Sequence, residues 1–352
     1  MRGAVKAGLI GGAAVAALLG GLWLYRTPLV THFVDRTLNE RGVRARYTIE
    51  QLGFGTQRLT NISIGDATHP DVTAQSVELT VRLSWSGPVV TAVHARGVRA
   101  RGRWTGQKFA FGDVDKLIPA DDGEPFILPD LAVTLHDGAA TLDTPWGRVG
   151  VGAAGRGNPA RAFSGQLAVN APAINAAGCH GAGLTANLAV QLRGGAPAIT
   201  GPVGVASARC AAHGIAVADA RIGLRLSADA GLDEWRGRAG FRSAAASVPQ
   251  LAMQSTDGSV DFTGSITGGQ NADWHVNARN ASTRWLQAGS VLVDGAARRE
   301  GDGTVDAAGT IAMADGRASA ATLRGIAALN GMDDATPFGP VARQLGRAAG
   351  AA

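Results

Sequence analysis

The sequence predicts a mainly β protein, in which an N-terminal transmembrane helix precedes a long, curled, mostly antiparallel sheet of a repeating groove type. Three observations predict this fold class. They are an uncharged apolar run near the N-terminus, a hydrophobic period of two along most of the chain, and a composition of 50 glycines among 352 residues with only 5% aromatic residues. Short helices are predicted near the N-terminus, in the middle and at the C-terminus. The chain has 17% charged residues and no basic block, which argues against a disordered polyelectrolyte and against nucleic acid as a partner.

The N-terminus predicts a membrane anchor. Residues 7–25 carry no charge, and as a helix they would span about 28 Å, close to the hydrocarbon thickness of a bilayer. The run ends in bulky residues such as Trp23, whereas a cleaved signal peptide needs small residues there. Arg2 and Lys6 favour a cytoplasmic N-terminus. We therefore predict an uncleaved, single-pass anchor in the inner membrane over 1–26, with the bulk of the chain in the periplasm of a Gram-negative cell. A cleaved signal peptide and a buried helix are the alternatives.

Residues 27–42 predict a short amphipathic helix just outside the membrane. Thr27 and Pro28 suit a helix start, and Gly42 suits a helix end. After this helix, apolar and polar residues alternate, which predicts strands with one apolar and one polar face. The clearest alternating runs are 43–50, 61–64, 77–83, 98–101, 131–135, 184–190 and 222–226.

Turn residues support a meander of strands over the region 43–317. Asp-Gly, the dipeptide preferred in two-residue hairpins, recurs along the chain. The pairs taken as hairpin signals begin at Asp137, Asp257, Asp302 and Asp315. We predict roughly 16 to 20 strands, a number at which an open sheet must coil or curl. The many glycines suit such curvature and the bulges that produce it.

Two helical segments interrupt or end this sheet. A short helix is predicted at 113–119, and with the irregular stretch after it this helix would subdivide the periplasmic region near 113–130. The C-terminal segment 318–352 is predicted to be helical, with a weak helix over 318–329 and an amphipathic one over 337–345.

The apolar strand faces need a cover. No predicted helix is long enough to cover so many strands, so the sheet closes on itself, a second sheet packs on it, or the face stays open to a ligand. A lining of Ala, Val, Ile and Leu would accept acyl chains, since each buried CH₂ contributes about 0.8 kcal/mol. Composition alone favours a sheet that packs its own core. The candidate lipid-binding residues of an open face are Ile62, Ile64, Val77, Leu79, Val81, Leu83, Leu131, Val133 and Leu135.

The chain has two cysteines, Cys179 and Cys210, both beyond the predicted anchor. In an oxidising compartment such a pair commonly forms a disulfide, which would stabilise the fold by roughly 3 kcal/mol in the chain-entropy model. Free thiols and a zinc site with His180 and His213 are the alternatives. Neighbouring residues on a strand point to opposite faces, which argues against Cys179 and His180 meeting on one metal. We predict no metal site.

Catalytic motifs are absent from the sequence. Residues 150–155 match the G-x-G-x-x-G pattern of dinucleotide sites, but Arg156 and Pro159 follow where a helix should start, and no acid lies about 20 residues further on. We interpret this segment as a turn in a glycine-rich chain. No acid, base, nucleophile or metal ligands converge in the sequence, so we predict no catalytic residues, no cofactor and no enzyme activity.

Several segments resemble a known family. Those similar to the N-terminal part of AsmA-like proteins are LTNISIG at 59–65, PDVTAQSVELTV at 70–81 and VHARGVRAR at 93–101. Two others, FGDVDKLIP at 111–119 and LDTPWG at 142–147, resemble the YdbH branch, which is often labelled "dicarboxylate transport". The segment ATPFGPVARQL at 335–345 resembles a part in the middle of such proteins.

The resemblance implies a function. Proteins of this group are anchored in the inner membrane, their periplasmic sheet curls into an apolar groove, and they are implicated in moving phospholipid between the inner and outer membranes. The YdbH branch is thought to meet a small outer-membrane lipoprotein at its C-terminal end. Members are usually much longer than this chain, so that contact would belong to a longer form. The alternatives are a non-catalytic envelope scaffold with a self-packed β-structure and, from the family label alone, an auxiliary factor for dicarboxylate uptake.

Overall fold

The computed structural model describes residues 38, 40–52, 55–85, 87–104, 109–117, 128–266, 268–301, 303–319 and 322–324. The predicted anchor at 1–26, most of the predicted helix at 27–42 and the segment 325–352 lie outside these residues. In the part of the chain that the structure describes, no helix is long and apolar enough to cross a bilayer.

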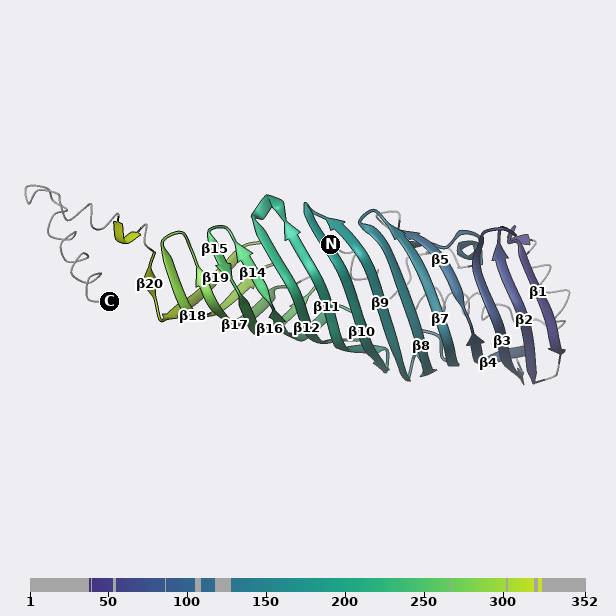
Figure 1. Cartoon of the computed structure of the whole chain (residues 1–352). Helices are drawn as coiled ribbons and strands as arrows, with labels where there is room; N and C mark the ends of the chain where they lie inside the picture. Colours follow the sequence, from purple (N-terminus) through teal and green to yellow (C-terminus); the bar gives the residue numbers. More distant parts are fainter. Residues whose placement is uncertain are drawn as a thin grey trace, which may run out of the picture. The chain divides into compact units, whose positions relative to one another are not determined.

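The described residues fold into twenty strand segments and two short 3₁₀ helices (Figure 1). In chain order the strands are β1 (Ala45–Leu52), β2 (Thr56–Gly65), β3 (Pro70–Ser84), β4 (Gly87–Arg96), β5 (Arg99–Trp104), β6 (Phe109–Ala110), β7 (Ala132–Thr144), β8 (Gly147–Asn158), β9 (Ala162–Ala176), β10 (Cys179–Arg193), β11 (Ala196–Cys210), β12 (Ile215–Ala228), β13 (Glu234–Ser243), β14 (Ala245–Val248), β15 (Leu251–Met253), β16 (Ser255–Ser265), β17 (Gln270–Ser282), β18 (Leu286–Arg299), β19 (Val305–Ala314) and β20 (Arg317–Ala318). The helices are η1 (Gly112–Leu117) and η2 (Ala211–His213). The predicted mainly β class and the short central helix are confirmed. Of the C-terminal segment 318–352 that was predicted to be helical, Ala318 instead ends strand β20, and residues 322–324 form a helical turn.

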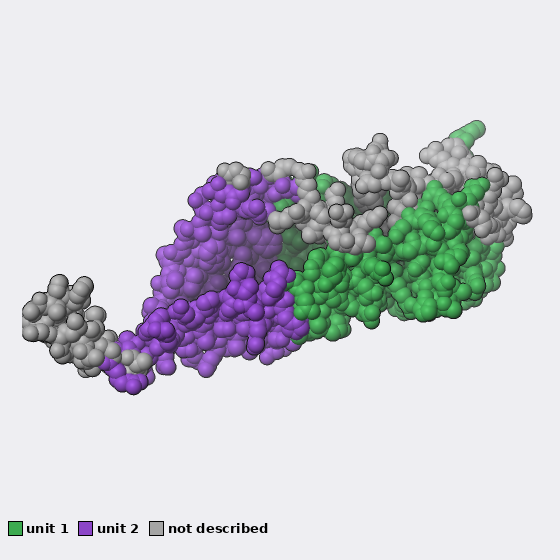
Figure 2. Space-filling model, turned by 90° about the horizontal axis from the view of Figure 1, so that it is seen from above, with its two compact units in different colours: residues 1–176, 182–203, 224–236 green, residues 177–181, 204–223, 237–352 purple. Residues whose placement is uncertain are grey.

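The chain divides into two compact units, which are coloured separately in Figure 2. Unit 1 consists of residues 1–176, 182–203 and 224–236, and unit 2 of residues 177–181, 204–223 and 237–352. The predicted subdivision near 113–130 lies inside unit 1.

Unit 1 is an antiparallel meander with one parallel step. Strands β1 to β4 pair in order and antiparallel, as do β7 to β9. Between these two groups, β7 runs parallel to β4 and to β5, with Ala92 opposite Ala132 and Arg99 opposite Ala139. Parallel neighbours need a crossover connection, and β6 and η1 belong to it. Phe111 and Val114 on this connection are 3% and 0% exposed, so it buries apolar side chains.

The core of unit 1 consists of two clusters on its strands. The larger joins the N-terminal strands to the crossover connection and contains Val43, Ile64, Val72, Ala74, Ala95, Val98, Ala100, Phe111, Val114, Leu135 and Leu142. The smaller contains Leu79, Val93, Leu131 and Val133. Both clusters form because the alternating apolar residues of neighbouring strands lie on one face of the sheet.

The sheet of unit 2 is also antiparallel. Strand β14 pairs with β12 and β15, and β15 pairs with β17. Strands β16, β17, β18 and β19 pair in order. Strand β20 pairs with the first residues of β18, next to the part of β18 that pairs with β19. In the view of Figure 2, the surface of unit 2 is hollowed.

The Asp-Gly pairs do not mark hairpins as predicted, except near 302–303. There, Gly303 lies in the turn between β18 and β19, where Glu300 and Thr304 close the loop by a backbone hydrogen bond of 2.9 Å. Asp137 lies inside β7 with a φ of 54°, at a shift in the register with β8. Asp257 lies inside β16 in regular pairing, and Asp315 separates β19 from β20 with a φ of 53°. The prediction was wrong because a left-handed Asp suits a strand bulge as well as a hairpin turn.

Candidate functional site

An extended uncharged surface of unit 2 lies on one face of strands β16 to β19. The strand register places its residues in four cross-strand rows, which together we call the apolar face of unit 2. The rows are Thr256–Ala278–Val291–Met313, Gly258–Val276–Val293–Ile311, Val260–Trp274–Gly295–Gly309 and Phe262–Ala272–Ala297–Ala307. None of these residues is charged. They share a face because side chains two positions apart on a strand point the same way.

The opposite face of the same strands carries most of their charges; Arg299, in the row after Ala297, lies on the same face as the four rows. The opposite face contains Asp257, Asp261, Asp273, His275, Asp294, Arg298 and Asp306, which alternate with the apolar rows. His275 and Asp294 pair across neighbouring strands, and Arg238 lies 3.7 Å from Asp261. The four strands therefore separate four uncharged rows from a hydrated face.

The apolar face of unit 2 is buried in part on β17 and β18 and exposed on the edge strand β19. Ala278 and Val291 belong to a buried cluster with Ala281 and Ala288. On the edge strand β19, by contrast, Ile311 is 69% and Met313 is 58% exposed.

Trp274 contributes the largest side chain of this face. Its ring packs over Gly295 of β18, where a Cβ would collide with it, so a glycine is required at this close approach.

The nine predicted lipid-binding residues lie on β2, β3, β7 and the residue before β7, all in unit 1. Five of them are in the core: Ile64 and Leu79 are each 5% exposed, Leu131 is 2%, and Val133 and Leu135 are 7%. Ile62 and Val77 pack against the clusters as partly buried side chains, and Val81 is also partly buried. The side chain of Leu83 lies outside the described part. The structure therefore brings most of these residues together, but in a filled core.

Helix η1 covers part of this core and is held by a charged cluster. The Asp113 carboxylate is 8% exposed. It accepts hydrogen bonds from Lys116 Nζ at 2.6 Å and from Arg44 Nε at 3.2 Å. The backbone N–H of Asp113 donates to the Asp71 carboxylate at 2.9 Å. We call Arg44, Asp71, Asp113 and Lys116 the Asp113 cluster; it joins η1 to β3 and to the segment before β1.

The Asp113 cluster also sets the charge state of its buried carboxyl. The hydrogen bond from Lys116 lowers the pKa of Asp113 below its usual value of 3.8, and hydrogen bonds from Arg44 act in the same direction against the opposing effect of burial. Asp113 is therefore ionised at neutral pH. The sequence did not reveal this role, because its partners Arg44 and Asp71 are distant in the chain.

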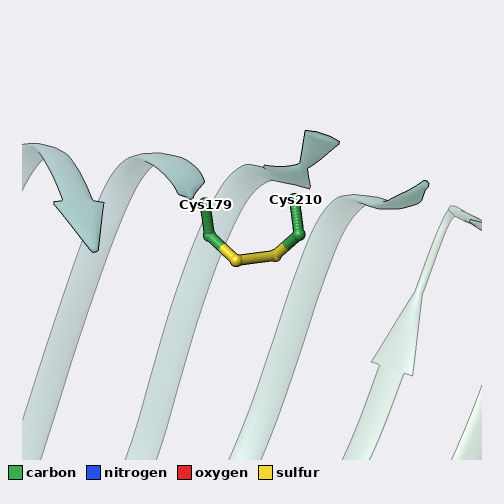
Figure 3. The surroundings of a disulfide bond; sticks show 2 residues. All are labelled: Cys179 and Cys210. Carbon is green, nitrogen blue, oxygen red and sulfur yellow. A yellow bond between two sulfur atoms is a disulfide. The ribbon is translucent and has the colours of Figure 1, made fainter. Parts of the chain in front are cut away.

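Cys179 and Cys210 are joined by a disulfide in unit 2 (Figure 3). Cys179 begins β10 and Cys210 ends β11, with their Cα atoms 3.9 Å apart. His180 follows on the strand as an exposed residue. In the described residues, no group of three His, Cys, Asp or Glu side chains has the geometry of a metal site.

Replacing both cysteines by serine is expected to lower the free energy of unfolding by about 3 kcal/mol, because the bond closes a loop with a sequence separation of 31. Urea denaturation with and without dithiothreitol measures the effect. The reductant should destabilise the parent chain and leave the Cys179→Ser/Cys210→Ser chain unchanged. Equal stability of the two chains under oxidising conditions would contradict the expectation.

The G-x-G-x-x-G segment at 150–155 was predicted to be a turn, but it lies within strand β8. A Cβ at Gly155 would lie 2.5 Å from the Phe163 ring on β9, so the glycine makes room for an aromatic side chain. A phosphate loop needs a helix N-terminus at this point, and the strand does not supply one.

The family of the chain is given by its match to a sequence model. The sequence model described as "YdbH-like: Intermembrane phospholipid transport protein YdbH" matches residues 13–345. The chain belongs to the YdbH-like family. The resemblance seen in the sequence is thereby confirmed. The family implies intermembrane phospholipid transport and suggests lipid as the cargo. It is not a known class of enzymes. No curated protein and no solved structure gives a significant match.

Proposed function

We propose that the chain is anchored in the inner membrane by residues 1–26 and carries phospholipid through the periplasm along the apolar face of its sheet. The observation that carries this proposal is the set of four uncharged rows on β16 to β19, with most charges of these strands on the opposite face. Each acyl CH₂ that leaves water on this face contributes about 0.8 kcal/mol. The four rows have no charged group to fix a headgroup, and the next row of the same face carries Arg299, opposite Gln270 and Val305.

In unit 1 the nine predicted residues remain part of the proposal, under one condition. Ile64 and Leu135 are buried in the cluster that contains Phe111 and Val114, so lipid would reach them after the segment with η1 moves. The Asp113 cluster holds that segment. A contact with a small outer-membrane lipoprotein remains a proposal for a longer form of the protein.

Site-specific photocrosslinking in cells tests the lipid path. Benzoylphenylalanine at Val293 or Ile311, on the apolar face of unit 2, should yield crosslinked phospholipid. The same probe at the adjacent Asp294 or Thr310, on the charged face, is the matched control and should yield none. Equal labelling of both faces, or label at neither, would refute the lipid path.

A non-catalytic envelope scaffold is the second candidate function. The filled clusters of unit 1 favour it, since a self-packed sheet needs no cargo. Absence of crosslinked lipid at Val293 and Ile311, with a folded protein, is the outcome that this alternative predicts.

A further inference from the structure

A cation ends the apolar face of unit 2. The row after Phe262–Ala272–Ala297–Ala307 consists of Gly264, Gln270, Arg299 and Val305, and we call it the end row. Arg299 is the last residue of β18 and the charged member of this row. Because alternate residues of a strand share a face, its guanidinium lies on the same side of the sheet as the four uncharged rows.

The guanidinium of Arg299 is accessible. Arg299 is exposed, and among the described residues no side chain forms an ion pair or a hydrogen bond with it. Its neighbour Arg298 faces the opposite side and is paired with Glu300 at 2.7 Å. Val305, which lies opposite Arg299 on the edge strand β19, is 61% exposed. A ligand can therefore reach Arg299 from solvent.

The chemistry of the end row favours a phosphate. A guanidinium binds a phosphate by two parallel hydrogen bonds. Gln270, opposite Arg299 on β17, is half-buried and has an amide N–H₂ that can donate to the same anion. The opposite face of these strands carries aspartates, which disfavour an anion there. They are Asp257, Asp261, Asp273, Asp294 and Asp306.

A strip of small residues leads from Arg299 along β18 and β19. The pairs of this strip, in order, are Ala297–Ala307, Gly295–Gly309 and Val293–Ile311. The Trp274 ring occupies the space over Gly295, whereas the β19 members of the three pairs are exposed. The strip is therefore open on its β19 side, next to the end row.

The strip is long enough for an acyl chain. Arg299 and Val293 are six residues apart on β18, which is about 20 Å at the rise of an antiparallel strand. The acyl region of one leaflet is about 15 Å thick, which is half of the hydrocarbon thickness of a bilayer. A lipid with its phosphate at Arg299 can therefore lay its whole acyl chain on uncharged residues.

We propose that the Arg299 guanidinium, with the Gln270 amide opposite it, binds the phosphate of a phospholipid whose acyl chain lies along β18 and β19. The inference rests on the proposed function and assigns the headgroup contact of that lipid path. It gives the bound lipid one orientation, with the phosphate at the end row and the acyl chain directed toward the buried residues Ala278 and Val291.

A competition between two lipids with identical acyl chains tests this contact. The full chain in detergent is loaded from mixed micelles with equal amounts of phosphatidylglycerol and diacylglycerol, and the bound lipid is quantified by mass spectrometry after repurification. The parent chain should retain phosphatidylglycerol in about five-fold excess, the upper range for an exposed charge pair. Arg299→Gln should bring the ratio to about one. Arg299→Lys, which keeps the charge and loses the planar fork, should keep part of the excess.

Arg298→Gln is the matched control. It removes the same charge from the adjacent residue, but on the opposite face, and should keep the parent ratio. Both arginines are exposed, so thermal melting should show the parent's stability in each variant.

The outcomes separate this inference from the proposed function. A parent chain that binds neither lipid refutes the proposed function and the contact with it. A parent chain that binds both lipids equally, an Arg299→Gln chain that keeps the excess, or an equal loss in Arg298→Gln refutes the headgroup contact alone.

A final arm distinguishes a lipid headgroup from a free phosphate ion. Inorganic phosphate in molar excess over the lipid, compared with chloride at the same ionic strength, should leave the parent ratio unchanged. The reason is that a free anion has no acyl chain to place on the rows, and an exposed charge pair alone binds weakly. A ratio that falls to one with phosphate and not with chloride would assign Arg299 to the free ion and overturn the proposal.

Discussion

Replacing Ile311 by lysine is expected to lower the phospholipid that copurifies with the full chain by about ten-fold or more. Ile311 lies on the edge strand β19 in a row with Val276 and Val293, so the ammonium would stand on the apolar face of unit 2. Covering that charge with an acyl chain costs several kcal/mol. Because the side chain is 69% exposed, the free energy of unfolding should change by only about 0.5 kcal/mol.

The matched control is Ala312→Lys, one residue further along β19. Ala312 is also exposed, but it faces the opposite side of the sheet. This variant gains the same charge on the same strand and should keep the parent's lipid content. Lipid quantification after detergent extraction, with thermal melting of each variant, measures both effects. Equal loss in the two variants would show that the charge acts by its presence on β19 and not by its place on the apolar face.

The sequence was sufficient to predict which side chains share a face. Alternation needs no knowledge of strand partners, because side chains two apart on a strand always point the same way. The alternating run at 77–83 lies within β3, and the runs at 131–135 and 184–190 lie within or at the start of β7 and within β10. The predicted mainly β class followed from this local signal alone.

The cover of that face could not be predicted, because it depends on contacts between distant residues. Asp113 was expected on a short helix with no assigned partner, yet Arg44 and Asp71 hold it from other strands or their ends. The parallel step between β5 and β7, which brings η1 onto the sheet, leaves no mark in the alternation. Whether an apolar face is filled or open is decided by this long-range placement.

Left-handed residues inside strands were also missed, although the sequence contains a signal for them. Asn61, Asp219 and Asn280 lie inside strands with φ values of 53°, 47° and 49°, a conformation that Asn and Asp tolerate better than most residues. An Asn or Asp within an otherwise alternating run is thus a candidate for a left-handed residue inside a strand. The same reading would have placed Asp137 inside β7 and not in a hairpin.

Replacing Asp113 by asparagine is expected to lower the free energy of unfolding of unit 1 by about 2 kcal/mol at neutral pH. The change removes a buried anion and leaves Lys116 and Arg44 without their shared partner. The side chains of those cations are 47% and 66% exposed, so solvent offsets part of the loss. The matched control is Asp143→Asn, which breaks the exposed ion pair with Arg148 and should cost about 0.5 kcal/mol or less.

The pH dependence of this difference distinguishes the charge of Asp113 from its shape. Because the folded protein lowers the pKa of Asp113 below 3.8, the carboxylate stabilises the fold fully above that pH, and the contribution is lost as the pH falls through the lower, folded-state value. Urea denaturation of the parent and of Asp113→Asn between pH 7 and pH 3 should therefore give curves that differ at neutral pH and begin to converge below about pH 4. A difference that persists unchanged at low pH would mean that packing of the side chain, and not its ionisation, holds η1 on the sheet.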